Sequence, residues 1–113
     1  MDIKYVRQLL NQGQIELEFS LPHALVEARK DGLSGDDLAE TVMTGEVIED
    51  YGERVLMLNF TENRKIPIHI VLEFFENDSI ATIVTAYIPS DSRWEPNWKT
   101  RKEAKGISKK RKR

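Results

Sequence analysis

The chain has 113 residues, of which 40% are hydrophobic and 32% are charged, with a formal net charge of −2. This is the length of one domain, and the composition is that of a globular rather than a disordered protein. No apolar run approaches the roughly 20 residues that span a bilayer, so no membrane partner is expected. The first ten residues lack the apolar core of a secretory signal, and we therefore expect a cytoplasmic location. The absence of cysteine excludes disulfides, thiolate catalysis and cysteine-based zinc sites.

The small net charge conceals an acidic body and a basic tail. The first 98 residues carry 8 basic and 18 acidic side chains, whereas the remainder carries 9 basic and 1 acidic. Residues 105–113 are too charged to fold alone, and we predict that they form a disordered tail after a single domain at residues 1–104. Such a tail would be attracted to RNA or ribosomes, and equally to the acidic body of its own or another copy.

The first half of the chain has helical periodicity. Apolar residues recur at helical spacing after Asp2, which is a suitable N-cap, and Gly13 marks the expected stop. A short extended stretch, Ile15 to Phe19, follows as a lead-in. Ser20 can cap a second helix that continues to Arg29. A third helix is predicted from the capping-box pattern that begins at Ser34, and it ends at Gly45.

After Gly45 the hydrophobic period changes to two. Strands are predicted at residues 47–51, 54–60, 66–75 and 80–88, separated by short turns that contain Asn, Asp or Gly. Consecutive hairpins after a run of helices predict an α+β fold. We expect two to three N-terminal helices packed on one face of a four-stranded antiparallel sheet.

One register keeps the predicted core consistent. If residues 77–79 form the last turn, then Ile70 lies opposite Ala86 and Leu72 opposite Val84, on the face toward the helices. The same register places His69 opposite Tyr87, on the outer face. We therefore expect the side chains of His69 and Tyr87 to interact directly or through water.

An ordered set of motifs resembles a bacterial family, the domain of unknown function 4258. The likeness covers about residues 19–102, and no single motif is specific although the order and spacing of the set are. The family has been grouped by sequence with the RelE, barnase, EndoU and colicin-like (BECR) toxin folds. That resemblance implies helices on a four-stranded antiparallel sheet and a metal-independent, RNA-cleaving ancestry. The acidic body departs from the basic RelE-type toxins. The motifs are S20-x-x-H23-A24 with R29, L33-S34-x-x-D37, T44-G45-E46-V47-I48-E49-D50-Y51, I68-H69-I70-V71, I83-V84-T85-A86-Y87-I88-P89, and W94 with K99-T100-R101-K102.

Metal-independent RNA cleavage needs groups that transfer protons and cations that hold phosphate. Our candidates for proton transfer are His69, Tyr87 and His23. Our candidates for substrate binding are Arg29, Thr85, Trp94, Lys99 and Arg101. Arginine can hold phosphate through two parallel hydrogen bonds, and tryptophan can stack on bases. No pattern indicates a metal site or a cofactor.

Each candidate also has a structural explanation. His23 can organise the start of its helix, and His69 can be a half-buried sheet residue satisfied by Tyr87 or Thr85. Arg29 can pair with a neighbouring carboxylate, and Thr85 is in any case a good strand former. Tryptophans just after a last strand often cover a sheet edge or the open end of a core.

Three functions remain open on the sequence alone. The first is a toxin-like, metal-independent ribonuclease, or an RNA-binding remnant of one, in which RNA binds along the outer sheet face and the tail. The second is a non-catalytic module whose sheet docks a cognate protein partner. The third is an antitoxin or immunity-type role in which the acidic body masks a basic partner. The acidic body favours the last two, whereas the group of His69, Thr85 and Tyr87 favours the first.

Overall fold

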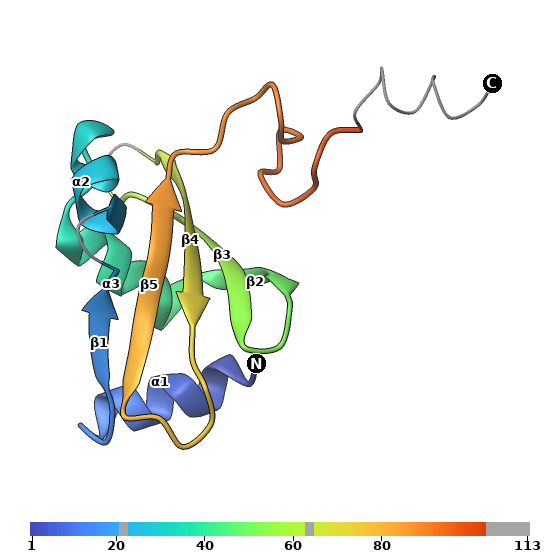
Figure 1. Cartoon of the computed structure of the whole chain (residues 1–113). Coiled ribbons are helices and arrows are strands. Elements are labelled where there is room, and N and C mark those ends of the chain that lie inside the picture. The colour runs from blue at the N-terminus through green and yellow to red at the C-terminus, as the bar shows by residue number, and fades with distance from the viewer. Residues whose placement is uncertain (21–22, 63–64, 104–113) are drawn as a thin grey trace.

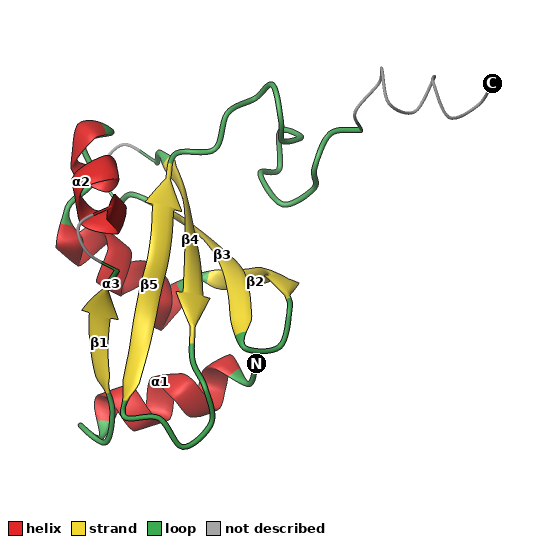
Figure 2. Ribbon diagram, in the orientation of Figure 1, coloured by secondary structure: helices red, strands yellow, loops and turns green. Residues whose placement is uncertain are grey.

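The computed structural model describes residues 1–20, 23–62 and 65–103. These residues form three helices and five strands, which are drawn in Figures 1 and 2. None of these helices is long and apolar enough to cross a membrane. The predicted basic tail at residues 105–113 lies outside the described residues. In chain order the elements are α1 (Ile3–Asn11), β1 (Glu16–Phe19), α2 (His23–Lys30), α3 (Gly35–Thr44), β2 (Glu46–Asp50), β3 (Arg54–Phe60), β4 (Pro67–Glu73) and β5 (Ile80–Tyr87).

The strands form one mixed sheet in the order β1-β5-β4-β3-β2. Strands β2 to β5 pair antiparallel in sequence order, as predicted, but β1 adds a parallel edge strand beside β5. The prediction of a four-stranded antiparallel sheet was therefore wrong in this detail, although the α+β class is confirmed. The predicted extended lead-in is the missing strand: Leu17 and Phe19 pack against the core, while Glu16 and Glu18 alternate with them.

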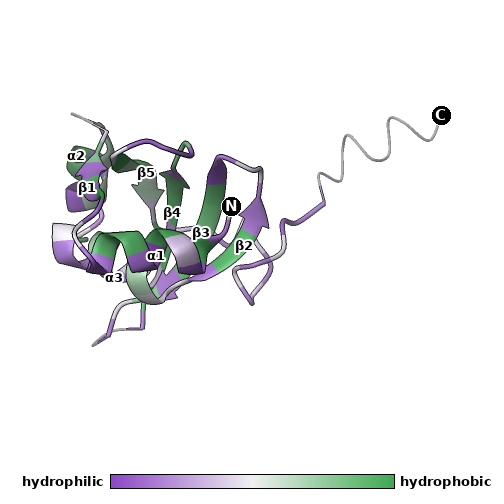
Figure 3. Ribbon diagram, turned by 90° about the horizontal axis from the view of Figure 1, so that it is seen from below, coloured by the Kyte–Doolittle hydropathy of each residue, from purple (hydrophilic) through white to green (hydrophobic). Residues whose placement is uncertain are grey.

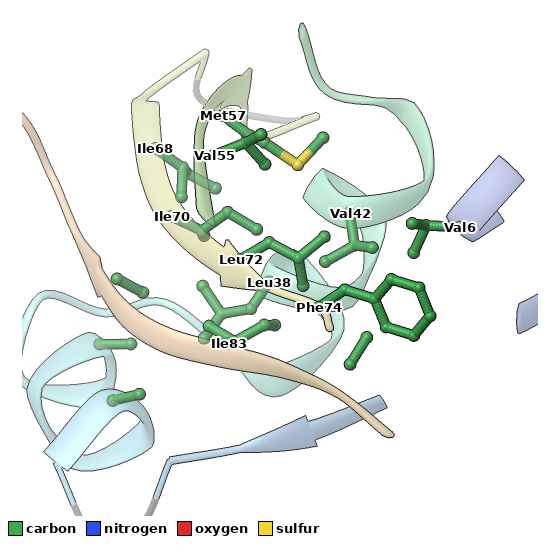
Figure 4. Close-up of a cluster of buried hydrophobic side chains, with 14 of the residues drawn as sticks. Val6, Leu38, Val42, Val55, Met57, Ile68, Ile70, Leu72, Phe74 and Ile83 are labelled. Atoms are coloured by element: carbon green, nitrogen blue, oxygen red, sulfur yellow. The ribbon is translucent and has the colours of Figure 1, made fainter. Parts of the chain in front are cut away.

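All three helices contribute to one core on a single face of the sheet. Val6 from α1, Ala28 from α2 and Leu38 from α3 belong to the same buried cluster as Ile70 and Ile83 from the sheet. Figure 4 shows the side chains of this cluster between the sheet and the helices, and Figure 3 shows the apolar side of the helices turned toward the strands. The other face of the sheet is thereby left for the rest of the chain.

The helix starts follow the local signals in the sequence. The Asp2 side chain caps α1 by accepting from the backbone N–H of Tyr5. At α3 the predicted capping box is confirmed, because Ser34 and Asp37 each accept a hydrogen bond from the other's backbone N–H. Helices α1 and α3 therefore begin where side chains can satisfy N–H groups that have no partner within the helix.

Arg7 holds α1 against the end of α3. Its guanidinium donates to the backbone carbonyl of Val42 at 2.8 Å and to that of Gly45. These carbonyls lie at the C-terminal end of α3, where helix carbonyls lack partners within the helix and the dipole favours a cation. Partial burial lowers the pKa of Arg7 from its ordinary value.

A β-bulge in β5 changes the predicted register. His69 lies opposite Tyr87 and Ile70 opposite Ala86, as expected. Beyond the bulge, however, Leu72 pairs with Ile83, so the predicted pairing of Leu72 with Val84 was wrong. The extra residue in β5 shifts the register by one and keeps an apolar side chain facing the core. The predicted three-residue turn is also wrong, because β4 ends at Glu73 and β5 begins at Ile80.

We predict that Gly45 is required by close backbone packing between α3 and β3. A Cβ atom at this position would lie 2.5 Å from the carbonyl oxygen of Thr41 and 2.9 Å from that of Leu58. Gly45→Ala should therefore lower the free energy of unfolding by about 1–3 kcal/mol, as overpacking usually does. Gly35→Ala is the matched control, because the nearest atom there would be 3.8 Å away. Urea denaturation that finds the two variants equally stable would contradict this explanation.

Candidate functional site

The outer face of the sheet is covered in part by the segment that follows β5. We call residues 90–102 the C-terminal strap. In Figure 1 this segment leaves the end of β5 and runs toward the side of β2 and β3. The strap folds back on itself as a hairpin-like loop, in which Lys102 N–H donates to the carbonyl of Arg93 and Glu95 N–H donates to that of Thr100. Its two arms therefore support each other although it contains neither a helix nor a sheet strand.

His69 lies between the sheet and the strap. Its side chain is fully buried, with 0% of its surface exposed. The ring nitrogen Nδ1 lies 3.2 Å from the hydroxyl of Tyr87, and Nε2 lies 2.7 Å from the backbone carbonyl of Trp98. The predicted interaction between His69 and Tyr87 is therefore confirmed. Both nitrogens have partners, so His69 can reach a ligand in this conformation only through Tyr87.

Trp94 closes the strap over His69. Its side chain is only 3% exposed, and its ring meets the imidazole edge to face, with centroids 4.4 Å apart. The guanidinium of Arg101 lies 4.7 Å from the centroid of the Trp94 ring, in the range of a cation–π contact. Trp94 is therefore a packing residue of the strap, which agrees with the expectation that a tryptophan after the last strand covers the sheet.

Two ion pairs join the strap to β2. Arg101 donates to both carboxylate oxygens of Glu49, at 2.8 and 3.0 Å, and Lys99 Nζ lies 2.9 Å from Glu46. Glu49 also accepts from the hydroxyl of Tyr51 at 2.7 Å. The hydrogen bond from Arg101 is the main cause that lowers the pKa of Glu49, and the same bond raises the pKa of Arg101. Both groups are therefore charged over the physiological pH range.

A bulge in β2 brings Glu49 to this face. Val47 pairs with Met57, whose side chain belongs to the core, but Glu49 pairs with Leu56 on the outer face. Simple alternation would place Val47 and Glu49 on the same side, so the extra residue, Ile48, turns the carboxylate outward. Glu49 was not among our candidates. The signal that could have found it is the pattern of β2 itself, because two apolar residues followed by two acidic ones do not alternate as a regular strand does.

A pocket of about 260 Å³ opens beside this network. Val71 and Leu56 lie in its lining, where they provide apolar surface from β4 and β3. The polar residues in its lining are two tyrosines, one glutamate and two arginines. Arg54 is paired with Glu73 at 2.6 Å, yet its side chain is 55% exposed, and that of Arg101 is 61% exposed. These polar residues are Glu49, Tyr51, Arg54, Tyr87 and Arg101.

The structure brings together some of the predicted residues and separates others. His69, Tyr87, Trp94, Lys99 and Arg101 gather at the outer face, and Thr85 lies beside them as the strand partner of Val71. Helix α2 packs on the opposite face of the sheet through Ala24 and Ala28. This helix begins at His23 and carries the exposed Arg29. Arg29, and the helix that begins at His23, therefore lie on the other side of the sheet from the pocket.

Larger hollows elsewhere on the molecule are acidic. One of about 610 Å³ is lined by Asp36, Asp37, Glu40 and Glu62, and one of about 350 Å³ includes Asp2, Glu53 and Glu76. Carboxylates in these positions repel phosphate groups. Among the described residues, no group of three or more His, Asp or Glu side chains could hold a metal ion. The smaller pocket on the outer sheet face is therefore the better candidate for binding an anion.

We predict that His69 makes stability depend on pH. Burial lowers its pKa below the ordinary 6.5, while the bond to Trp98 and the charge of Glu49 oppose this shift and Arg101 adds to it. The unfolded chain then binds a proton before the folded protein does, so stability is lost as pH falls below about 6.5. His69→Gln should be less stable at pH 7 by about 1–3 kcal/mol, since a buried hydrogen bond is removed.

The stability gap between wild type and His69→Gln should narrow as pH falls from about 7 to about 5. Only the wild type has a histidine at this position to protonate, and Glu49 titrates below this window because its pKa is lowered. Thermal or urea unfolding at a series of pH values measures the gap. A gap that stays constant over this window would show that His69 does not titrate differently in the folded and unfolded states.

Comparison with known proteins and protein families identifies the family of this chain. No curated protein and no solved structure matches the chain. Residues 21–88 match the domain of unknown function DUF4258, which spans α2 to the end of β5 and so includes His69, Glu49 and Tyr87. The match ends before the strap begins. Because it covers more than half of the chain, the protein belongs to the DUF4258 family.

Proposed function

We propose that the protein is a toxin-like, metal-independent ribonuclease, or an RNA-binding remnant of one, with its site in the pocket on the outer sheet face. One observation carries the proposal. A single pocket is lined by a tyrosine whose hydroxyl bonds a buried histidine, by a glutamate, and by two exposed arginines. Cleavage of RNA without a metal needs this combination of a proton-transfer group and cations that neutralise the phosphate.

Tyr87 is the proton-transfer group in this proposal. It lines the pocket and also contacts His69, so it connects a bound ligand to a second titratable group. Burial raises the pKa of Tyr87, which keeps the phenol protonated at neutral pH. His69 does not line the pocket and has no free nitrogen, so it acts on Tyr87 and not on substrate.

Arg101 and Arg54 are the phosphate-binding groups. Each presents a planar guanidinium that can donate two hydrogen bonds to phosphate oxygens. Glu49 and Glu73 hold them in place without neutralising all of their donors. Trp94 fixes Arg101 by stacking, and Lys99 ties the strap to Glu46, so these two predicted binding residues act through the strap. Thr85, beside Tyr87 on β5, remains a candidate contact for substrate.

The acidic surface favours a different function as the alternative. Phosphate-binding proteins usually present a basic surface, but the first 98 residues carry a large excess of acid, and acidic side chains line the larger hollows. A non-catalytic module, or an antitoxin or immunity-type protein, would use such a surface to dock a basic cognate partner. In that case the buried His69 network serves only to hold the strap on the sheet.

The ribonuclease proposal predicts that Tyr87→Phe removes cleavage while the fold is kept. Loss of a general acid–base group typically costs about 10²–10⁴-fold in rate. Purified protein is incubated with ribosomes and with total RNA, and the products are separated by size. Tyr5→Phe is the matched control, because Tyr5 is an exposed tyrosine on α1. This helix packs on the face of the sheet opposite the pocket. Equal cleavage by both variants would exclude Tyr87 from the chemistry.

Arg101→Gln should weaken RNA binding and cleavage together, because it removes a cation from the pocket and from the strap. Lys30→Gln removes one charge from the exposed end of α2 and should change neither. RNA that stays uncut by the wild type at all protein concentrations, with or without ribosomes, would reject the ribonuclease function and leave the docking module.

Deletion of residues 105–113 removes six cations. If the tail supplies non-specific affinity, binding should weaken for all RNA sequences. The slope of the logarithm of the binding constant against the logarithm of salt concentration should also decrease in magnitude by about 0.7 for each phosphate that the tail no longer neutralises. Tyr87→Phe should leave this salt dependence unchanged, since a phenol releases no counterions. Fluorescence-anisotropy titrations at several salt concentrations would measure both, and an unchanged slope after deletion would show that the tail does not bind RNA.

A further inference from the structure

The C-terminal strap contributes to the site although it lies beyond the family match at residues 21–88. It supplies Arg101 to the pocket, and it supplies the backbone carbonyl of Trp98 to the otherwise isolated Nε2 of His69. The effect of this carbonyl on the imidazole determines which way the hydrogen bond between His69 and Tyr87 runs.

We propose that the strap makes Tyr87 a proton acceptor toward its ligand, by fixing His69 in the neutral form that carries its proton on Nε2. The ligand that suits such a site has a hydroxyl beside an anionic group, as a ribose 2′-hydroxyl lies beside its phosphate. This inference rests on the proposed function and names the substrate class for the same pocket: ribonucleotides, with deoxyribonucleotides excluded.

The form of His69 follows from the chemistry of its partners. A backbone carbonyl can only accept a hydrogen bond, so at 2.7 Å the Nε2 of His69 must carry the proton. Burial disfavours the imidazolium, which leaves Nδ1 with a free lone pair. Tyr87 must then donate its hydroxyl proton to Nδ1, across 3.2 Å. The lone pairs of the phenolic oxygen remain available to a donor in the pocket that Tyr87 lines.

The strap holds the Trp98 carbonyl in a backbone conformation that few bulky residues adopt. Trp98 has φ of +62°, in the left-handed region, which is uncommon for a residue other than glycine. Its N–H donates to the carbonyl of Glu95 at 2.8 Å. The side chain of Asn97 accepts from the N–H groups of Lys99 and Thr100, at 2.8 and 3.1 Å. These bonds on both sides of Trp98 define the turn that directs its carbonyl at His69.

The proton steps balance within this arrangement. The ribose 2′-hydroxyl gives its proton to the oxygen of Tyr87, and Tyr87 gives its own phenolic proton to Nδ1 of His69. The 2′-oxygen forms a bond to phosphorus, the bond from phosphorus to the 5′-oxygen breaks, and that oxygen takes a proton from water. The hydroxide left from that water is neutralised when the imidazolium returns its proton to Tyr87 and Tyr87 releases one to solvent. The resulting imidazolium donates to Trp98 and to Tyr87, and the negative charge of Glu49 favours it.

The first test is the state of the His69 ring in the full-length protein. Long-range ¹H–¹⁵N correlation spectra at pH 7 distinguish the two neutral forms of histidine and the imidazolium. Only two histidines are present, so the assignment needs a single His23→Gln spectrum. A neutral ring protonated on Nε2 supports the proposal. A ring protonated on Nδ1, or an imidazolium at this pH, overturns it whether or not the protein cleaves RNA.

The second test compares adenosine 3′-monophosphate with its 2′-deoxy counterpart as probes, with binding followed by NMR titration. The ribonucleotide should bind more tightly, and Tyr87→Phe should remove most of that preference, since phenylalanine has no oxygen to accept from the 2′-hydroxyl. Equal binding of the two nucleotides, or no binding of either, overturns the assignment of the ligand.

Two variants of His69 separate its two contacts. The amide of Asn reaches the place of Nδ1 and can accept from Tyr87, whereas the longer amide of Gln reaches the place of Nε2 and can donate to Trp98. Neither amide is basic enough to take the phenolic proton of Tyr87, so in RNA cleavage both variants should lose about 10²-fold or more. Activity kept by His69→Gln, which preserves only the bond to Trp98, would show that His69 only anchors the strap. A wild type that cuts no RNA would reject the proposed function, and the ring state measured by NMR would still decide this inference.

Discussion

The hydrogen bond between Nε2 of His69 and the carbonyl of Trp98 joins the two parts of this molecule. One part is the domain of helices and sheet, whose core lies on the inner face. The other is the strap, which has no regular secondary structure and is held by what it contacts. The bond lies under Trp94 and is shielded from water, so it is worth more than a surface contact and would leave two buried polar groups unpaired if it broke. Among the described residues no buried side-chain nitrogen or oxygen lacks a partner, which is the result expected of such an arrangement.

The contacts that hold the strap differ in strength and in purpose. Burial of Trp94 removes a large apolar surface from water and contributes most, on the order of a few kcal/mol. The ion pair of Lys99 with Glu46 joins two exposed side chains, and such a pair typically contributes about 0–1 kcal/mol. In the pair of Arg101 with Glu49 only the arginine is exposed, since the side chain of Glu49 is 18% exposed. The ion pairs therefore serve mainly to set the position of the strap along β2. The burial of Trp94 is the main contact that attaches the strap to the sheet.

The order of elements could be predicted from the sequence because each one carries its own local signal. Capping residues begin the helices at Asp2 and Ser34, and the change of hydrophobic period after Gly45 marks the start of the antiparallel strands. The place of β1 in the sheet was missed because β1 pairs with a segment more than sixty residues away in the sequence. No local pattern specifies a long-range parallel partner. The bulges were missed for a related reason: period-two alternation does not account for an extra residue, and each bulge is fixed by packing against a neighbouring strand.

The site shows the same division between local and long-range information. The pairing of His69 with Tyr87 could be predicted because both lie in adjacent strands whose register the apolar core fixes. The role of Glu49 could not be predicted, because the bulge at Ile48 places Glu49 on the opposite face of the sheet from the one that regular alternation gives. The full burial of His69 could not be predicted either, because the sequence indicated only that the tryptophans cover a sheet edge or the open end of the core, and not that the strap closes over this histidine. Sequence alternation therefore places side chains on a face, but it does not show what later covers that face. The covering segment determines whether a histidine there meets solvent, a substrate or only its neighbours.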